Sequence, residues 1–475
     1  MPMLPSLITA LVTSSSARGA DAEHQIHASA GCRLPKRPAW TRLGELHQGP
    51  PLRVEDPLNS AGVRKYLLFL PHMYTQHTPH PLILDFSGYG DTAQSQAMQD
   101  NLWKVADRKG FVAVYPEGMA DNTTDEGYAS NSWNAAGSNG SLGALGPVCS
   151  PDHDSYPCYA SCARAGLCNA PGSSCVSSTC VDDVGFTRTL LQHLADHLCL
   201  DLARIHGTGI SNGAMFLYYL ATTSLAALFA SIVPVAGSVL IGHLQKPTTQ
   251  LSLMDIHGLQ DTIIPPTSKT SLAPYDEVGC PVKAAGLHGC TVSADGFYYV
   301  SRPVLLDSWR AMCNQNGTSL PFPTPFDGQD GFSCVLPFGD CEVDILQCTH
   351  NGGHNWPFIE RSPEKYAELV WWFVEPRRNV RKAFQADHSF GIFLGALAGC
   401  LASTFILVML NYAWCRCPWY ANGVFQIPGL GMVRQLRFHR QTPSFGSRPD
   451  SIGDVTEEEE SVELQNANDP VQTLW

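Results

Sequence analysis

The residues best suited to chemistry surround a serine that stands between two glycines. The run 207–213 (GTGISNG) contains one G-x-S-x-G pentad, with Ser211 at its centre. Flanking glycines allow a sharp turn that exposes the serine hydroxyl. Residues 202–206 (LARIH) predict a short buried strand and residues 212–222 an apolar helix, so strand, turn and helix follow in order. This context indicates a nucleophile, although the pentad alone also fits an ordinary glycine-rich turn.

A serine nucleophile needs a base within hydrogen-bond reach and an acid that orients the base. Asp261 follows the predicted strand 252–256 and is the candidate acid, although a turn aspartate fits it as well. His350 and His354 follow the strand-like run 344–348 and are the candidate bases. We prefer His354, because two glycines directly precede it. Serine, acid and histidine in this chain order are one known arrangement of a catalytic triad.

An acyl-transfer site also needs two backbone N–H groups aimed at the developing oxyanion. The residue after the nucleophile, Asn212, supplies one of them. The other is expected in the turn 86–91, where Gly88 and Gly90 flank Tyr89. The sequence therefore predicts an oxyanion hole made by Asn212 with Gly88 or Tyr89.

The elements that must position these residues alternate along the chain. Strands are predicted at 65–70, 81–86, 111–115, 231–236 and 252–256, and helices at 95–109, 183–197 and 363–374. Apolar runs this short, alternating with helices, predict an α/β fold with a mostly parallel sheet covered on both faces. We expect this domain to span 57–376, after an irregular lead-in at 21–56.

Charge and cysteine content narrow the class of protein. The net charge of −13 argues against nucleic acid as a partner. Fourteen of the 17 cysteines precede residue 349, as do sequons at Asn122, Asn139 and Asn316. This combination favours an oxidising secretory compartment. Six cysteines fall in the segment 139–180, which predicts a disulfide-rich insertion of unknown pairing, with a zinc site as the less favoured alternative.

Two apolar segments suggest a membrane protein. Residues 1–20 fit a signal peptide, and residues 389–413 are long and apolar enough for one transmembrane helix. Basic residues at 377–382 alone would favour a cytosolic domain, but the cysteines and sequons outweigh them. Gly391, Gly395 and Gly399 share one helix face and suggest a homodimer contact. The remaining tail, 414–475, is expected to be cytosolic and disordered.

Several ordered motifs together resemble a known group of enzymes. They are VDDVGF at 181–186, GISNGAM around Ser211, HGLQDTIIP through Asp261, DSWRAMC at 307–313 and GGHNWP around His354. They are similar to those of the polyhydroxybutyrate depolymerase and feruloyl or acetylxylan esterase group of secreted α/β-hydrolases. The resemblance covers roughly residues 65–373. It implies an α/β-hydrolase fold and a serine esterase without metal or organic cofactor, in which Ser211, Asp261 and His354 match the triad.

The chain departs from that group at two positions near the expected site. Ser87 precedes Gly88 where the group usually has histidine, and Ala214 stands where it often has glycine. We therefore expect a membrane-anchored esterase facing the lumen or cell exterior, acting on feruloyl or acetyl polysaccharide esters or on polyesters. The alternative is an inactive hydrolase-fold adhesion or receptor protein.

Overall fold

The computed structural model describes residues 27–379, except for 60–61, 122–129, 136, 141–142, 155, 157, 169–174, 268–288, 314–316, 340 and 360–361. The expected signal peptide, transmembrane helix with Gly391, Gly395 and Gly399, and tail lie outside the described residues. The sequons at Asn122 and Asn316 also lie outside them. Within the described part, no helix combines the length and apolar character needed to cross a membrane.

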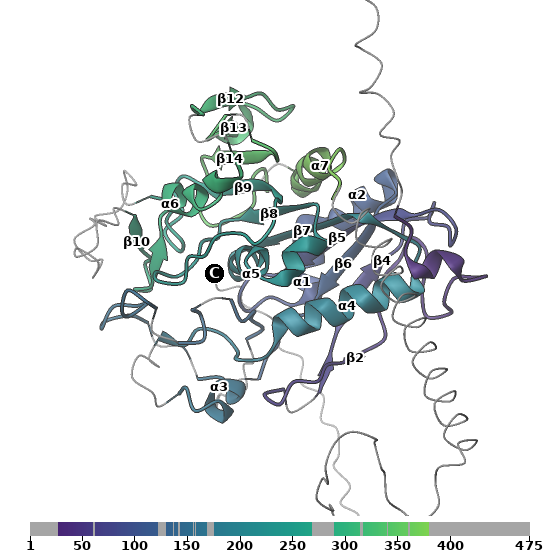
Figure 1. The fold of residues 1–475 in the computed structure, drawn as a ribbon, viewed down its shortest axis with the longest axis horizontal. Coiled ribbons are helices and arrows are strands. Elements are labelled where there is room, and N and C mark those ends of the chain that lie inside the picture. Colours follow the sequence, from purple (N-terminus) through teal and green to yellow (C-terminus); the bar gives the residue numbers. More distant parts are fainter. Residues whose placement is uncertain are drawn as a thin grey trace, which may run out of the picture. The chain divides into compact units, whose positions relative to one another are not determined.

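A large twisted sheet forms the centre of the domain (Figure 1). Its strands lie in the order β1 (Leu46–Gln48), β4 (Tyr66–Phe69), β6 (Val112–Pro116), β5 (His80–Phe86), β7 (Leu200–Ile210), β8 (Ser231–Val235), β9 (Ser252–Gly258), β14 (Ile345–His350), β13 (Ser333–Leu336) and β12 (Leu320–Phe322). The strands from β6 through β14 run parallel, and antiparallel pairs flank them on both sides. The predicted α/β class with a mostly parallel sheet is confirmed.

Helices cover both faces of this sheet. Successive strand residues point to opposite faces, so each central strand buries side chains under both helix layers. On β5, Leu82 and Leu84 enter one buried cluster while Ile83 enters the other. The first cluster packs under α4 (Asp183–His197), α5 (Asn212–Ala221) and α6 (Arg302–Asp307). The second packs under α1 (Ala93–Asp100), α2 (Leu102–Lys109) and α7 (Pro363–Val374). Figure 1 shows α4 and α7 on opposite sides of the strands.

One predicted helix is divided in two. The run expected as a single helix at 95–109 breaks at Asn101, whose φ of 55° is left-handed. Asparagine tolerates this conformation better than most residues do. The Asp100 carboxylate accepts the Leu102 N–H at 2.8 Å, and the Tyr115 hydroxyl accepts the Trp103 N–H at 3.0 Å. These two bonds satisfy donors at the start of α2, so the second helix begins without a lost hydrogen bond.

Part of the expected irregular lead-in belongs to the sheet. Strand β1 pairs with β4, with Leu46 opposite Phe69, and a disulfide joins Cys32 to Cys199 beside β7. The remaining short elements include β2 (Leu52–Arg53) paired with β3 (Val63–Arg64), β10 (Cys290–Val292) paired with β11 (Tyr298–Val300), and α3 (Ala160–Arg164). The 3₁₀ turns are η1 (Ala30–Arg33), η3 (Ser224–Leu228), η5 (Arg310–Met312) and η6 (Gln329–Gly331). The ordered domain therefore begins before residue 57.

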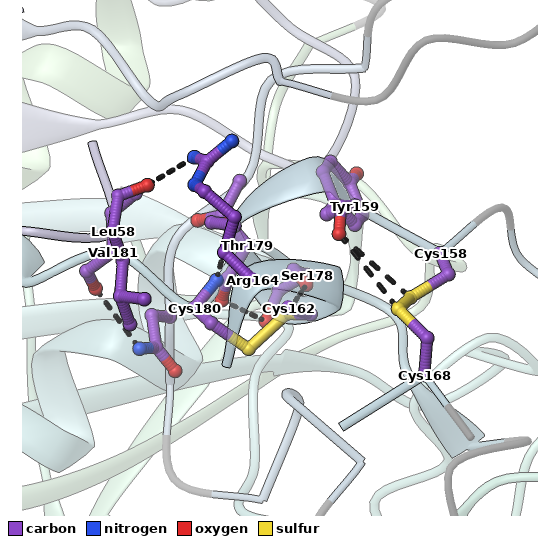
Figure 2. Close-up of a disulfide and its surroundings, with 12 residues drawn as sticks. Leu58, Cys158, Tyr159, Cys162, Arg164, Cys168, Ser178, Thr179, Cys180 and Val181 are labelled. Atoms are coloured by element: carbon purple, nitrogen blue, oxygen red, sulfur yellow. Dashed lines mark hydrogen bonds between the residues drawn. A yellow bond between two sulfur atoms is a disulfide. The ribbon is translucent and has the colours of Figure 1, made fainter. Parts of the chain in front are cut away.

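The cysteine-rich insertion is held by disulfides. Three pairs close it, namely Cys149–Cys175, Cys158–Cys168 and Cys162–Cys180. Figure 2 shows the last two beside Tyr159, which with Cys162, Val176 and Cys180 forms a small buried cluster. Cys313–Cys341 and Cys334–Cys348 lie elsewhere, and Cys290 is also disulfide-bonded. The disulfide prediction is confirmed over zinc, since the insertion's thiols are consumed by these bonds.

Candidate active site

Ser211 occupies the sharp turn between β7 and α5. Its φ of 55° and ψ of −120° form a strained backbone that non-glycine residues rarely adopt. A Cβ at Gly209 would lie 2.6 Å from the Phe86 carbonyl oxygen, and one at Gly213 would lie 2.2 Å from it. Both glycines therefore allow the turn to close against the end of β5. Nearly every residue of helix α5 is buried, so packing around the helix holds the turn that precedes it in place.

The structure brings Asp261 and His354 together beside this turn. Asp261 follows β9 and His354 follows β14, and these strands are parallel neighbours whose carboxyl ends meet at one edge. The His354 Nδ1 lies 2.8 Å from the Asp261 Oδ2. Ser211 and His354 both line one cavity. A carboxylate at Nδ1 fixes the tautomer in which Nε2 accepts a proton, as a general base requires.

The Asp261 carboxylate is buried yet ionised. Burial by itself would raise its pKa, but hydrogen bonds from His257 and His354 outweigh that effect and hold the pKa well below the usual range. The other oxygen, Oδ1, accepts the N–H groups of Ile263 and Ile264, each at 2.9 Å. These bonds hold the loop in an Asx-type turn and leave Oδ2 to contact the two histidines.

His257 is a member of the site that sequence reasoning missed. It is buried in β9, and its Nε2 lies 3.2 Å from the Asp261 Oδ2 and 2.7 Å from the Ile264 carbonyl oxygen. Both neighbours are acceptors, so Nε2 carries the proton and donates. The only signal in the sequence was a histidine four residues before the acid, at the end of a strand. That spacing is common and indicates no role by itself.

The two candidate bases occupy different environments. His354 is 20% exposed at the cavity, whereas His350 is buried at the end of β14. The His350 Nδ1 accepts the Gly352 N–H at 3.1 Å. Burial, with smaller contributions from His257 and Arg302, lowers the pKa of His350 to about 4. His354, and not His350, therefore lies at the cavity with its ring bonded to Asp261, while His350 shapes the loop that carries it.

The expected oxyanion residues also lie at the turn. Gly88 adjoins Ser211, because a Cβ built on Gly88 would lie 3.6 Å from the Ser211 Cβ. Gly88, Tyr89 and Asn212 all line the same cavity as Ser211 and His354. Asn212 is the first residue of α5, where backbone N–H groups have no partner within the helix. These positions suit two N–H donors directed at an oxyanion.

A buried tryptophan links the expected oxyanion loop, residues 86–91, to the nucleophile turn, which carries Ser211 between β7 and α5. The Trp133 Nε1 donates to the Ser87 carbonyl oxygen at 3.0 Å. The Asn212 side chain pairs with the Trp133 backbone, accepting its N–H at 2.6 Å and donating to its carbonyl oxygen at 3.1 Å. The Trp133 ring stacks on Phe216 of α5, with centroids 5.3 Å apart. The side chain of Asn212 thus has a structural task in addition to its backbone N–H.

The two departures from the esterase pattern are accommodated locally. The Ser87 hydroxyl is buried and donates to the Asp91 carbonyl oxygen at 3.3 Å, which closes the turn of the oxyanion loop. The Ala214 methyl lies against Gly237, where a Cβ would approach it to 2.4 Å. Neither Ser87 nor Ala214 is among the described residues that line the cavity of Ser211 and His354.

The cavity at this site has a volume of about 320 Å³. The oxyanion loop, the nucleophile turn, the acid and histidine loops, the β10–β11 hairpin and the insertion all contribute to it. Its remaining lining side chains are Tyr89, Asp91, Gln99, Tyr156, Ser177, Ile210, Met215, Ile263, Ile264, Asp295, Phe297, Tyr299 and Trp356. Tyr156 and Ser177 come from the insertion, so the disulfide-bonded segment forms part of the wall.

Comparison with known proteins finds no matching family model and no matching curated protein. Solved structures match this chain only at low identity and low TM-score. An acetyl xylan esterase from Aspergillus awamori is 10% identical, with a TM-score of 0.38 over 69% of this chain and 100% of that chain. An S-formylglutathione hydrolase from Agrobacterium tumefaciens is 14% identical, with a TM-score of 0.36 over 70% of this chain and 96% of that chain. Likeness at this level does not decide function, which rests on the site itself.

Proposed function

We propose that the chain is a serine hydrolase that cleaves carboxylic esters through an acyl-enzyme. The observation that carries this proposal is the His354–Asp261 hydrogen bond of 2.8 Å beside a cavity that Ser211 also lines. An imidazole oriented by a buried ionised acid rarely shares a cavity with a strained serine unless these groups react together.

The reaction would proceed in two halves. Ser211 Oγ attacks the ester carbonyl carbon while His354 Nε2 takes its proton, and the oxyanion is held by the N–H groups of Asn212 and of Gly88 or Tyr89. The intermediate collapses, the bond to the alcohol oxygen breaks, and His354 returns the proton to that oxygen. Water then attacks the acyl-serine by the same route and releases the acid. Asp261 holds the imidazolium throughout without taking its proton.

For the substrate, we propose feruloyl or acetyl polysaccharide esters or a polyester. Support comes from the motifs around Ser211, Asp261 and His354 and from the aromatic side chains in the cavity wall. For the location, we propose a membrane-anchored domain on the extracytoplasmic side. The disulfides support an oxidising compartment, and the apolar run 389–413 supports an anchor. Alkaline extraction of membranes tests the anchor, because an integral protein stays with the lipid.

The activity is tested with the purified full-length chain and its Ser211→Ala variant on p-nitrophenyl acetate and methyl ferulate. We expect the variant to lose at least about a thousandfold in kcat. Ser333→Ala removes an exposed serine on β13 and serves as the matched control, with wild-type rates expected. Equal turnover by the wild type and Ser211→Ala would overturn the proposal. If the wild type shows no turnover and no labelling by a fluorophosphonate probe, the proposal also fails and a non-catalytic binding protein is favoured.

A further inference from the structure

The charge of the active-site cavity is one-sided. Two carboxylates line it beside Ser211 and His354, those of Asp91 and Asp295, and no lysine or arginine lies among its described lining residues. Among these described lining residues, His354 is the one side chain with titratable nitrogen atoms. An ester with a negative group would be repelled by both carboxylates, whereas a cation would be attracted.

Asp295 is held in place by a residue of the insertion. The Tyr156 hydroxyl donates to its Oδ2 at 2.7 Å, and the Ser293 hydroxyl donates to its Oδ1. Burial raises the pKa of Tyr156, and the negative charge of Asp295 raises it further, so the hydroxyl stays protonated and remains a donor. Two hydroxyl donors therefore hold the carboxylate in a fixed position at the cavity wall.

Asp91 lies beside Gly88 of the expected oxyanion loop, and both residues line the cavity with Ser211. Its Oδ1 accepts hydrogen bonds from Ser95 at 2.8 Å and from Gln99 at 3.4 Å. Its Oδ2 lies 3.8 Å from a Cβ built on Gly88. A negative charge beside the oxyanion loop opposes the charge that develops on the substrate. A substrate that brings its own positive charge removes this penalty.

Aromatic side chains line the same cavity as the two carboxylates. Tyr89 and Tyr156 meet edge to face with ring centroids 5.4 Å apart, and Tyr156 meets Phe297 in the same way at 5.6 Å. Tyr299 and Trp356 line the same cavity. The negative faces of such rings attract organic cations, and partial desolvation in a cavity strengthens the attraction.

We propose that this cavity selects esters that carry a quaternary-ammonium-type cation, held by Asp91, Asp295 and the aromatic side chains. The proposal rests on the proposed ester hydrolase function and specifies its substrate class. It takes the place of the carbohydrate and polyester substrates considered above, because neither of those is positively charged.

The test uses ester pairs of equal shape that differ in charge, with the purified full-length chain. Acetylcholine is compared with neohexyl acetate, its uncharged carbon isostere. The ethyl ester of γ-trimethylammoniobutyrate is compared with the analogue in which tert-butyl replaces the trimethylammonio group, which places the charge on the acyl side. We expect kcat/KM to favour the cationic member of at least one pair by about tenfold or more.

The variants Asp91→Asn and Asp295→Asn should each lower that ratio at least about threefold. Asp196→Asn removes the same charge from the exposed surface of α4 and should leave the ratio unchanged. If no pair is hydrolysed, inhibition of p-nitrophenyl acetate turnover is compared for choline and for neohexanol, and choline should inhibit more strongly.

A ratio near one in both pairs, or equal inhibition by choline and neohexanol, would overturn the inference while Ser211-dependent turnover of a neutral ester upheld the hydrolase. A preference that survives in both Asp variants would also overturn it. Loss of the hydrolase itself appears separately, as p-nitrophenyl acetate turnover that does not depend on Ser211.

Discussion

The indole nitrogen of Trp133 donates a hydrogen bond to the main-chain carbonyl of Ser87, 46 residues earlier in the chain, at 3.0 Å. The same tryptophan is held through its own backbone by Asn212, the residue after the nucleophile. The two parts of the expected oxyanion hole are thus positioned relative to each other by one buried side chain. Catalysis by preorganised donors depends on such fixed placement.

Replacing Trp133 by phenylalanine should therefore impair turnover more than binding. Trp133→Phe keeps a ring against Phe216 but removes the donor to Ser87, so kcat should fall about tenfold or more while KM changes little. Steady-state kinetics on p-nitrophenyl acetate measure this split. Trp309→Phe, at another fully buried tryptophan, is the matched control. An equal loss of kcat in the control would reduce Trp133 to a packing residue.

Asp261→Asn should nearly abolish turnover without unfolding the chain. The amide cannot hold His354 in the tautomer that accepts the serine proton, so kcat should fall about a thousandfold or more. Asp295→Asn changes another cavity carboxylate to its amide and should have a far smaller effect on p-nitrophenyl acetate. Comparable losses in both variants would contradict the assignment of Asp261 as the triad acid.

His257 is expected to act through Asp261. In His257→Phe the second donor to the carboxylate is lost, so the acid is held less firmly and kcat should fall about tenfold. His257→Gln retains an N–H donor at similar reach and should recover part of that loss. Full activity in His257→Phe would show that the contact at 3.2 Å contributes nothing to the reaction.

His350 makes stability depend on pH. Its pKa is about 4 in the folded chain against 6.5 in the unfolded chain, so the unfolded chain binds the proton first as the pH falls. The contribution of His350 to the free energy of unfolding is therefore complete above pH 6.5. It falls by on the order of 3 kcal/mol as the pH decreases from 6.5 to about 4. Urea unfolding of the wild type and His350→Gln at both ends of this range measures the difference. Parallel losses in the two proteins would exclude His350 as the cause.

Much of the fold was readable because its signals are local. The strands β5, β6, β8 and β9 are short apolar runs bounded by polar residues, and the helices at 183–197 and 363–374 were predicted with the bounds that the structure has. The nucleophile turn was readable because both glycines stand next to Ser211 in the sequence. Asp261 and His354 were placed by the strands that precede them.

The remaining features depend on contacts between distant residues. Strand β1 has three residues, too few for a periodic signal, and forms only because β4 pairs with it. Trp133 and Ser87 meet through the tertiary fold, and nothing near either residue indicates the bond. The break at Asn101 depends on the Tyr115 hydroxyl of the neighbouring strand. Disulfide pairing in the insertion likewise follows from three-dimensional proximity and not from spacing.

The Cys32–Cys199 disulfide joins two cysteines that are 167 positions apart in the sequence, and the whole insertion lies between them. A single protease cut anywhere between these cysteines would leave both fragments joined in one covalent molecule. Nicked and intact protein would therefore migrate together on a gel without reductant, and only reduction would separate the two pieces. Cleavage inside the insertion could thus reshape the wall formed by Tyr156 and Ser177 without releasing any part of the catalytic machinery.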